Sequence, residues 1–200
     1  MPNLYIIAGC NGAGKTTASY TVLPEILHCK EFVNADEIAK GLSPFQPETV
    51  SFHAGRIMLQ RIDELINQQA DFAFETTLTT LSYQQTIQFA RENGYKISLL
   101  FFWLNDVNLG IERVKTRVSE GGHNIPVDVI VRRYNKGIIN FLNVFVNLCD
   151  YWLVIDNSNK PFSLIAEGNK NTTSVIYDNK SWINSLNGTF ITVPMTLMRG

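Results

Sequence analysis

An eight-residue segment near the start of the chain carries the strongest chemical signal. It matches the pattern G-x-x-x-x-G-K-[ST], in which glycines let successive backbone N–H groups point inward at a phosphate chain. The matching residues are Gly9, Cys10, Asn11, Gly12, Ala13, Gly14, Lys15 and Thr16. At this chain's composition the pattern arises by chance in roughly one sequence of two hundred. An apolar run precedes it and a helical pattern follows, as the mechanism requires, so the segment predicts a P-loop.

Each polar side chain of this loop has a predicted role. Lys15 would reach the β- and γ-phosphates, and the Thr16 hydroxyl would ligate Mg²⁺. The predicted cofactors are therefore ATP and Mg²⁺. The predicted nucleotide-binding residues are Gly9, Asn11, Gly12, Ala13, Gly14, Lys15, Thr16 and Thr17, the last opening the following helix. The alternative is an ordinary glycine-rich turn between a strand and a helix.

Acidic residues that end predicted strands are the candidates for acid–base and metal chemistry. Asp36 follows a short strand at residues 31–34, where it could accept a proton from an attacking hydroxyl. The alternative is that Asp36 merely caps the helix after it. Glu75 ends the third strand, which adjoins the P-loop strand if the sheet order is 2-3-1-4-5, so we expect it near the metal. Asp156 ends the fifth strand and is interpreted as a turn residue.

Basic residues concentrate between positions 112 and 136 of a chain whose net charge is only −1. Arg113 and Arg117 share one face of a predicted helix, where two cations repel unless an anion lies between them. A glycine pair at 121–122 provides the hinge that a closing lid needs. Arg132 and Arg133 lie ~100° apart on the next helix, so only one is expected to face the site. A solvated helix face is the alternative explanation for this charge.

Alternating strands and helices predict an α/β fold, a P-loop NTPase three-layer sandwich around a mostly parallel sheet. We expect one domain over residues 1–200, with a helical lid at about 112–136 and a C-terminal β-hairpin and helix at about 160–190. The expected strands are 4–8, 31–34, 72–75, 96–104 and 151–155, with hairpin strands at 162–167 and 174–177. The expected helices are 16–27, disturbed near Pro24, and 48–69, 83–92, 105–120 and 127–147.

The composition excludes several classes of protein. A hydrophobic fraction of 45% excludes disorder, and 17 basic against 18 acidic residues argue against a nucleic-acid partner. The three cysteines are too widely spaced for a disulfide framework or a metal site. No apolar stretch is long enough to span a bilayer, and the N-terminus shows no leader pattern. We therefore expect a cytoplasmic protein without a membrane partner.

A P-loop alone does not separate a switch, a motor and a kinase. The run Asn159-Lys160-Pro161-Phe162 lacks the Asp of a guanine-reading motif, and the strand ending at Glu75 does not end in Asp-Glu, as motor ATPases do. An acceptor-side carboxylate and several arginines favour a kinase acting on a small hydroxyl-bearing molecule. The alternative is an ATP-binding switch or slow ATPase with a regulatory role. A polynucleotide kinase is disfavoured by the charge balance.

The chain resembles the zeta-toxin-like branch of small P-loop kinases over roughly residues 4–167. Besides the P-loop, the resemblance rests on Val33-Asn34-Ala35-Asp36, Phe74-Glu75-Thr76-Thr77, Glu112-Arg113 with Arg117, Gly121-Gly122-His123, Arg132-Arg133-Tyr134 and Asp156-Asn157-Ser158. Prototypes of this branch phosphorylate a sugar hydroxyl of UDP-N-acetylglucosamine with ATP. The Gly-Gly-His segment is closer to the chromosomal zeta-like ATPases than to the plasmid toxins.

The resemblance implies roles for individual residues. Asp36 would be the catalytic base, and Glu75 and Thr77 would contact the substrate. Either Arg113 or Arg117, together with Arg132 or Arg133, would clamp the phosphates. His123 lies in the implied lid, either as a phosphate donor or as a turn residue. An antitoxin-type protein partner is also implied.

Overall fold

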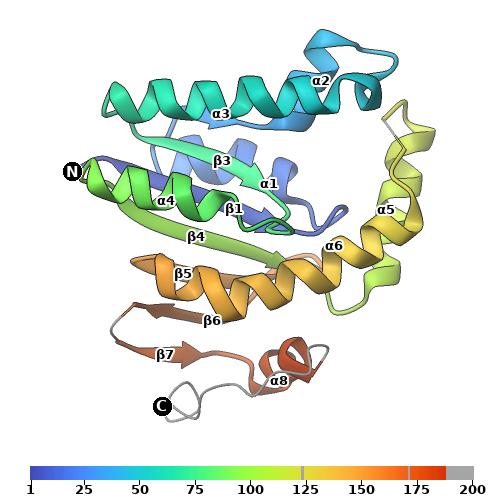
Figure 1. Cartoon of the computed structure of the whole chain (residues 1–200). Helices are drawn as coiled ribbons and strands as arrows, with labels where there is room; N and C mark the ends of the chain where they lie inside the picture. Colours follow the sequence, from blue (N-terminus) through green and yellow to red (C-terminus); the bar gives the residue numbers. More distant parts are fainter. Residues whose placement is uncertain (123, 171, 188–200) are drawn as a thin grey trace.

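A single seven-stranded sheet organises the chain in the computed structural model, which describes residues 1–122, 124–170 and 172–187 (Figure 1). The strand order is β2-β3-β1-β4-β5-β6-β7, so the predicted 2-3-1-4-5 order is confirmed. β1 to β5 pair in parallel, and their carboxyl ends therefore meet at one edge. The strands are β1 (Asn3–Gly9), β2 (Glu31–Val33), β3 (Phe72–Thr76), β4 (Lys96–Trp103), β5 (Tyr151–Asp156), β6 (Ser163–Asn169) and β7 (Thr172–Ile176).

Helices cover both faces of the sheet. Figure 1 shows α3, α4 and α6 along one face and α1 on the other, which is the predicted three-layer arrangement. The helices are α1 (Lys15–Thr21), α2 (Ala35–Leu42), α3 (Ser51–Asn67), α4 (Tyr83–Glu92), α5 (Val107–Ser119), α6 (Val127–Asn140), α7 (Val146–Leu148) and α8 (Asn179–Asn187). No helix of the described residues is long and apolar enough to cross a bilayer.

The two core layers follow from the period-two alternation of the strands. Phe72 and Phe74 of β3 belong to the larger core, beneath α3 and α4, whereas Ala73 between them faces the smaller core beneath α1. Seven of the eight residues of β4 are buried, as expected for a parallel strand covered on both faces.

Two predicted helices are irregular. The helix predicted over 16–27 is α-helical only to Thr21 and continues as a π-helical turn over Val22–Ile26, around Pro24, which has no N–H for the regular ladder. The helix predicted over 127–147 passes through a second π-helical turn at Phe141–Phe145 before α7. The second irregular turn contains neither proline nor glycine. Its Phe141 stacks on Phe101 of β4 with ring centroids 4.6 Å apart, a contact between distant parts of the chain that the local sequence does not predict.

The segment predicted as a lid corresponds to α5, which lies beyond the carboxyl edge of the sheet, and to α6, which begins beside α5 and runs back along one face of the sheet (Figure 1). A small cluster of Val114, Ile125 and Ile130 packs the two helices together. The predicted hairpin is β6–β7, and it extends the main sheet, because β6 pairs antiparallel with β5. Trp182 of α8 stacks on Trp152 of β5 with ring centroids 5.9 Å apart. His123 and residues 188–190 of the predicted C-terminal segment lie outside the described residues.

Candidate active site

The P-loop is a turn that requires glycine at several positions, Gly12 and Gly14 among them. Gly12 and Gly14 have φ values of +78° and +80°, in the left-handed region that favours glycine. A Cβ at Gly12 would lie 2.4 Å from the carbonyl oxygen of Gly110, and one at Gly14 would lie 2.3 Å from Nδ2 of Asn157. α1 begins at Lys15, so its N-terminus faces into the loop.

Arg113 holds this loop against the end of β5. Its Nη1 donates to the carbonyl oxygens of Gly12 (3.3 Å) and Asn157 (2.9 Å), and its Nη2 donates to that of Ser158 (3.0 Å). Asn157 adds a hydrogen bond from Nδ2 to the carbonyl oxygen of Ala13 at 2.8 Å. The guanidinium of Arg113 is thus occupied by three carbonyls and supports the cradle from behind.

Arg117, one helical turn further along α5, is in the opposite situation. Its Nε and Nη2 are buried and make no hydrogen bond within the described part of the chain. The side chain lines a hollow of about 460 Å³ together with Lys15, Thr16 and Asp36. Two buried guanidinium nitrogens without a hydrogen-bond acceptor are costly, so the arrangement suits an anionic ligand in this hollow.

Glu75 stands beside both functional side chains of the P-loop. Its Oε1 lies 3.4 Å from Nζ of Lys15, and its Oε2 accepts a hydrogen bond from Oγ1 of Thr16 at 2.7 Å. Nζ of Lys15 also donates to the carbonyl oxygen of Cys10 at 2.9 Å, and only 5% of Lys15 is exposed. The pairing of β1 with β3, with Ile7 opposite Glu75, brings this carboxylate next to the loop.

Asn34 is a site residue that the sequence reasoning missed. It caps α2 in an extended conformation, and its Oδ1 accepts from the backbone N–H groups of Asp36 (2.8 Å) and Glu37 (3.4 Å). Its Nδ2 donates to Oε2 of Glu75 at 3.0 Å. The cap of α2 is therefore Asn34 and not Asp36. The preference of Asn for helix N-caps after a strand was the available signal.

Asp36 lies where three hollows meet. It lines the 460 Å³ hollow of the P-loop and two others of about 210 and 320 Å³. The 210 Å³ hollow is rich in hydroxyl groups from the loop after β3 and the start of α4. The residues that line it with Asp36 include Asn11, Lys15, Glu75, Thr77, Thr79, Thr80, Tyr83 and Arg133. Asp36 thus borders both the P-loop hollow and the hydroxyl-lined hollow.

Hydrogen bonds from α6 hold the loop after β3 in place. Nδ2 of Asn140 donates to the carbonyl oxygens of Leu78 (2.6 Å) and Thr79 (3.2 Å), and Asn140 is 4% exposed. The hydroxyls of Thr77 and Thr79 are hydrogen-bonded at 2.7 Å. The segment that carries Thr77 is therefore fixed by hydrogen bonds at both Leu78 and Thr79.

The two neighbouring arginines of α6 differ in position. Arg133 is half-buried, and its Nη1 donates to Oδ1 of Asn11 in the P-loop at 3.0 Å. Burial lowers the pKa of Arg133, with the nearby Asp36 opposing and Arg132 adding to the shift. Arg132 is exposed and lines only the 320 Å³ hollow on the other side of Asp36. Arg133 is thus the one that reaches the P-loop.

Asp156, the rival carboxylate, is engaged in its own turn. Its Oδ1 accepts hydrogen bonds from the backbone N–H of Ser158 at 2.8 Å and from the Ser158 hydroxyl. The interpretation of Asp156 as a turn residue agrees with these contacts.

The donors around the P-loop fit a nucleoside triphosphate with Mg²⁺. The backbone amides of the loop, Lys15 and Arg117 would serve the phosphates, and Thr16 with Glu75 would serve the metal. Among the described residues no group of three or more His, Cys, Asp or Glu could hold a metal ion by itself.

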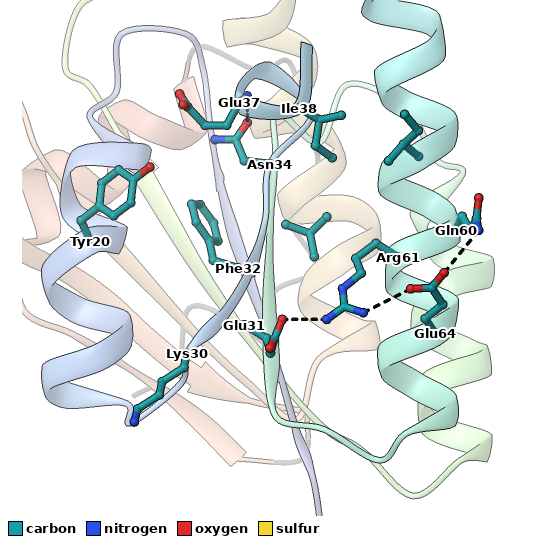
Figure 2. Close-up of a pocket in the computed structure, with 12 residues that line it drawn as sticks. Tyr20, Lys30, Glu31, Phe32, Asn34, Glu37, Ile38, Gln60, Arg61 and Glu64 are labelled. Atoms are coloured by element: carbon teal, nitrogen blue, oxygen red, sulfur yellow. Dashed lines mark hydrogen bonds and ion pairs between the residues drawn. The ribbon is translucent and has the colours of Figure 1, made fainter. Parts of the chain in front are cut away.

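A hollow larger than the three around Asp36 does not have this chemistry. It measures about 680 Å³ and lies along the free edge of β2 between α1 and α3 (Figure 2). Its Arg61 is neutralised by Glu31 at 3.0 Å and Glu64 at 3.1 Å. Only Asn34 and Glu37, at its upper end in Figure 2, connect it with the site around Asp36.

The fold and the site define a P-loop protein of the kinase type, with the cradle on β1 and carboxylates on the neighbouring strand ends. The chain belongs to the zeta toxin family, whose family model matches residues 1–181. An uncharacterized protein of Haemophilus influenzae is 32% identical over 126 residues, which are 63% of this chain and 88% of that protein.

Solved structures share the fold at low sequence identity. A chain of the AvrRxo1-ORF1:AvrRxo1-ORF2 complex with sulphate ions superposes with a TM-score of 0.78 at 14% identity, over 98% of this chain and 66% of that chain. The present chain thus spans slightly less than two thirds of that relative. A chain from the structure of the PezAT toxin–antitoxin system of Streptococcus pneumoniae superposes with a TM-score of 0.69 at 17% identity, over 99% of this chain and 83% of that chain. A gluconokinase of Sinorhizobium meliloti superposes with a TM-score of 0.50 at 12% identity, over 94% of this chain and 90% of that chain.

Proposed function

We propose that this protein is an ATP- and Mg²⁺-dependent phosphotransferase that acts on a hydroxyl of a small molecule, with a nucleotide sugar as the first candidate. The observation that carries the proposal is the position of Asp36, which lines the P-loop hollow and the hydroxyl-lined hollow at once. Membership of the zeta toxin family supports it. So does the similar AvrRxo1-ORF1:-ORF2 complex crystallised with ATP, with a TM-score of 0.76 at 15% identity.

The donor side would be held by the loop amides, Lys15 and Arg117. Thr16 and Glu75 would hold Mg²⁺, which supplies neutralisation of phosphate charge when bound. Arg113 acts on this side only indirectly, because its guanidinium is bound to three carbonyls. In this assignment Arg117 is the phosphate clamp on α5, and Arg133 is its counterpart on α6.

On the acceptor side, Asp36 would take the proton of the attacking hydroxyl. A bond forms between the acceptor oxygen and the γ-phosphorus, while the bond from that phosphorus to the β–γ bridging oxygen breaks and ADP leaves with the electron pair. Thr77 would orient the acceptor through its hydroxyl. Such transfer depends on positioning and electrostatics more than on covalent chemistry, so each of these groups is expected to matter by orders of magnitude.

An ATP-to-ADP assay over nucleotide sugars, nucleosides and simple sugars tests the proposal. Wild-type protein should consume ATP when one acceptor class is added, and Lys15→Ala should not. Asp36→Asn should keep ATP binding and lose transfer by about 10²–10⁴-fold. Asp106→Asn, a cap substitution on α5 whose side chain lies outside the hollows, is the matched control.

Two outcomes would redirect the proposal. Near-normal transfer by Asp36→Asn would reject this residue as the base. ATP binding without consumption in the presence of any acceptor would favour the alternative, a nucleotide-dependent switch. A protein partner of the antitoxin type is a further part of the proposal, supported by the PezAT toxin–antitoxin system among the similar structures.

A further inference from the structure

One side chain connects the two halves of the proposed site. Asn34 is 6% exposed and uses both ends of its amide. Its Oδ1 accepts from the first turn of α2, which carries Asp36, at 2.8 Å and 3.4 Å. Its Nδ2 donates to Oε2 of Glu75 at 3.0 Å and lies 3.5 Å from Oγ1 of Thr16. Figure 2 shows the oxygen of this amide turned toward the start of α2.

The chemistry at this position is specific to a carboxamide. Ser, Thr and Asp can cap a helix as well as Asn does, because each offers an oxygen to the free N–H groups. Asp has no donor and would put a second carboxylate against Glu75. Ser is shorter and has one hydroxyl for both tasks. Capping of α2 alone therefore does not require a carboxamide at position 34, whereas capping together with donation to Glu75 does.

The connection also bears on the direction of the Glu75 carboxylate. Its Oε1 faces Lys15, and its Oε2 receives both Thr16 and Asn34. Among these three contacts within the described residues, only the one from Asn34 comes from the segment that leads into α2. The other two come from Lys15 and Thr16 of the P-loop. Loss of this donor leaves Glu75 held by P-loop groups alone and frees it from the helix that carries Asp36.

We propose that Asn34 is a positioning residue, which fixes the Glu75 carboxylate at the metal-binding threonine and ties it to the helix bearing Asp36. It acts through Glu75 and touches no reacting atom. This inference rests on the proposed function for its consequence in transfer, but the contact between Asn34 and Glu75 can be tested by nucleotide binding alone.

The test is a double-mutant cycle with a non-hydrolysable ATP analogue as the probe, titrated with Mg²⁺ and with EDTA. Asn34→Ser keeps an oxygen for the cap and should weaken binding in Mg²⁺ about tenfold, with less than a twofold change in EDTA. In a Glu75→Gln background the same substitution should change binding in Mg²⁺ by less than twofold. Asp106→Ser, the same kind of cap exchange on α5, should leave both affinities unchanged.

Additive losses in the cycle, or an equal loss with and without Mg²⁺, would overturn the inference, because Asn34 would then act only through the stability of α2. Once an acceptor is known, Asn34→Ser should lower kcat more than it raises the KM for the acceptor. A wild-type protein that transfers to no acceptor, yet shows coupling in the cycle, would refute the proposed function and leave the role of Asn34 intact. Phosphoryl transfer by the wild-type protein without coupling between Asn34 and Glu75 would support the proposed function and refute the role of Asn34.

Discussion

Lys15 and Glu75 form a nearly buried ion pair, with 3.4 Å between Nζ and Oε1, at the point where the P-loop meets the end of β3. The lysine that is expected to meet the phosphates is therefore already paired, and the carboxylate keeps it in the cradle. A long flexible side chain would otherwise lose more conformational entropy on binding a nucleotide. The ion pair with Glu75 explains how Lys15 is held in place in a hollow that Lys40, Arg113 and Arg117 also line.

Lys15→Ala should remove most of the nucleotide affinity while the protein stays folded. The lysine supplies the only ammonium in contact with Glu75 among the described residues, and its loss removes a charge-assisted contact with phosphate. We expect at least a 100-fold loss of ATP affinity by calorimetry. The fold should persist, because Thr16 and Asn34 still donate to the carboxylate. Unchanged affinity would place the nucleotide elsewhere.

Arg113→Ala should destabilise the protein. Three carbonyl groups lose their donor, which corresponds to about 2–4 kcal/mol of unfolding free energy. Arg113→Lys should recover only part of it, because an ammonium lacks the fork of donors that joins Gly12 to Asn157 and Ser158. Urea unfolding measures the effect. Wild-type stability in Arg113→Ala would contradict the supporting role.

Arg117→Ala should have the opposite profile, although the two arginines are four residues apart on one helix. Its buried nitrogens make no hydrogen bond among the described residues, so removing them should leave stability within about 0.5 kcal/mol or raise it. Affinity for ATP should fall about 10–100-fold, because a phosphate partner is lost. Urea unfolding and nucleotide titration of the same sample check both halves of the prediction. A strongly destabilised variant with normal affinity would reverse the assignment.

Gly12→Ala should lower both stability and nucleotide binding. The new methyl would stand 2.4 Å from a backbone carbonyl oxygen of Gly110, and φ is +78°. We expect a cost of about 1–3 kcal/mol from backbone strain, measured by urea unfolding. Gly55→Ala is the matched control, since Gly55 lies within α3 with nothing within 4 Å of an added Cβ. It should raise stability by about 1 kcal/mol.

Stability should decline in alkali because of three buried thiols. Burial raises the pKa of Cys10 and Cys29 to about 11 and that of Cys149 to about 12. The folded state therefore keeps protons that the unfolded chain releases near pH 9, so stability is complete below that pH and falls as pH rises toward 11–12. Each thiol contributes a slope of at most about 1.4 kcal/mol per pH unit.

Urea unfolding between pH 8 and 11 measures this decline. Cys149→Ala should reduce the slope by the share of one thiol, because Cys149 is fully buried. The remaining decline belongs to the other thiols and to tyrosines, among them Tyr134, whose pKa burial also raises. An identical slope in wild type and variant would show that Cys149 does not titrate differently in the two states.

The sequence by itself determined the place of the P-loop and the alternation of strands with helices, because both follow from local patterns. The 2-3-1-4-5 order was an expectation, and the strand pairing in the structure confirms it. A glycine-rich turn between an apolar strand and a helix has one geometry, and parallel strands bring their carboxyl ends together. Asp36 and Glu75 could therefore be assigned to the same edge. The family was also recognisable from these motifs, and the match over residues 1–181 confirms it.

Only the tertiary structure decided how similar side chains divide their work. Arg113 and Arg117 share a helix face and cannot be told apart by spacing, but Arg113 meets carbonyls that lie 101 and 44 residues away in the chain. The two-sided role of Asn34 depends on Glu75, 41 residues further on. Such contacts arise from the packing of distant segments, which no local pattern encodes, and so the division between support and binding emerged only once the chain was folded.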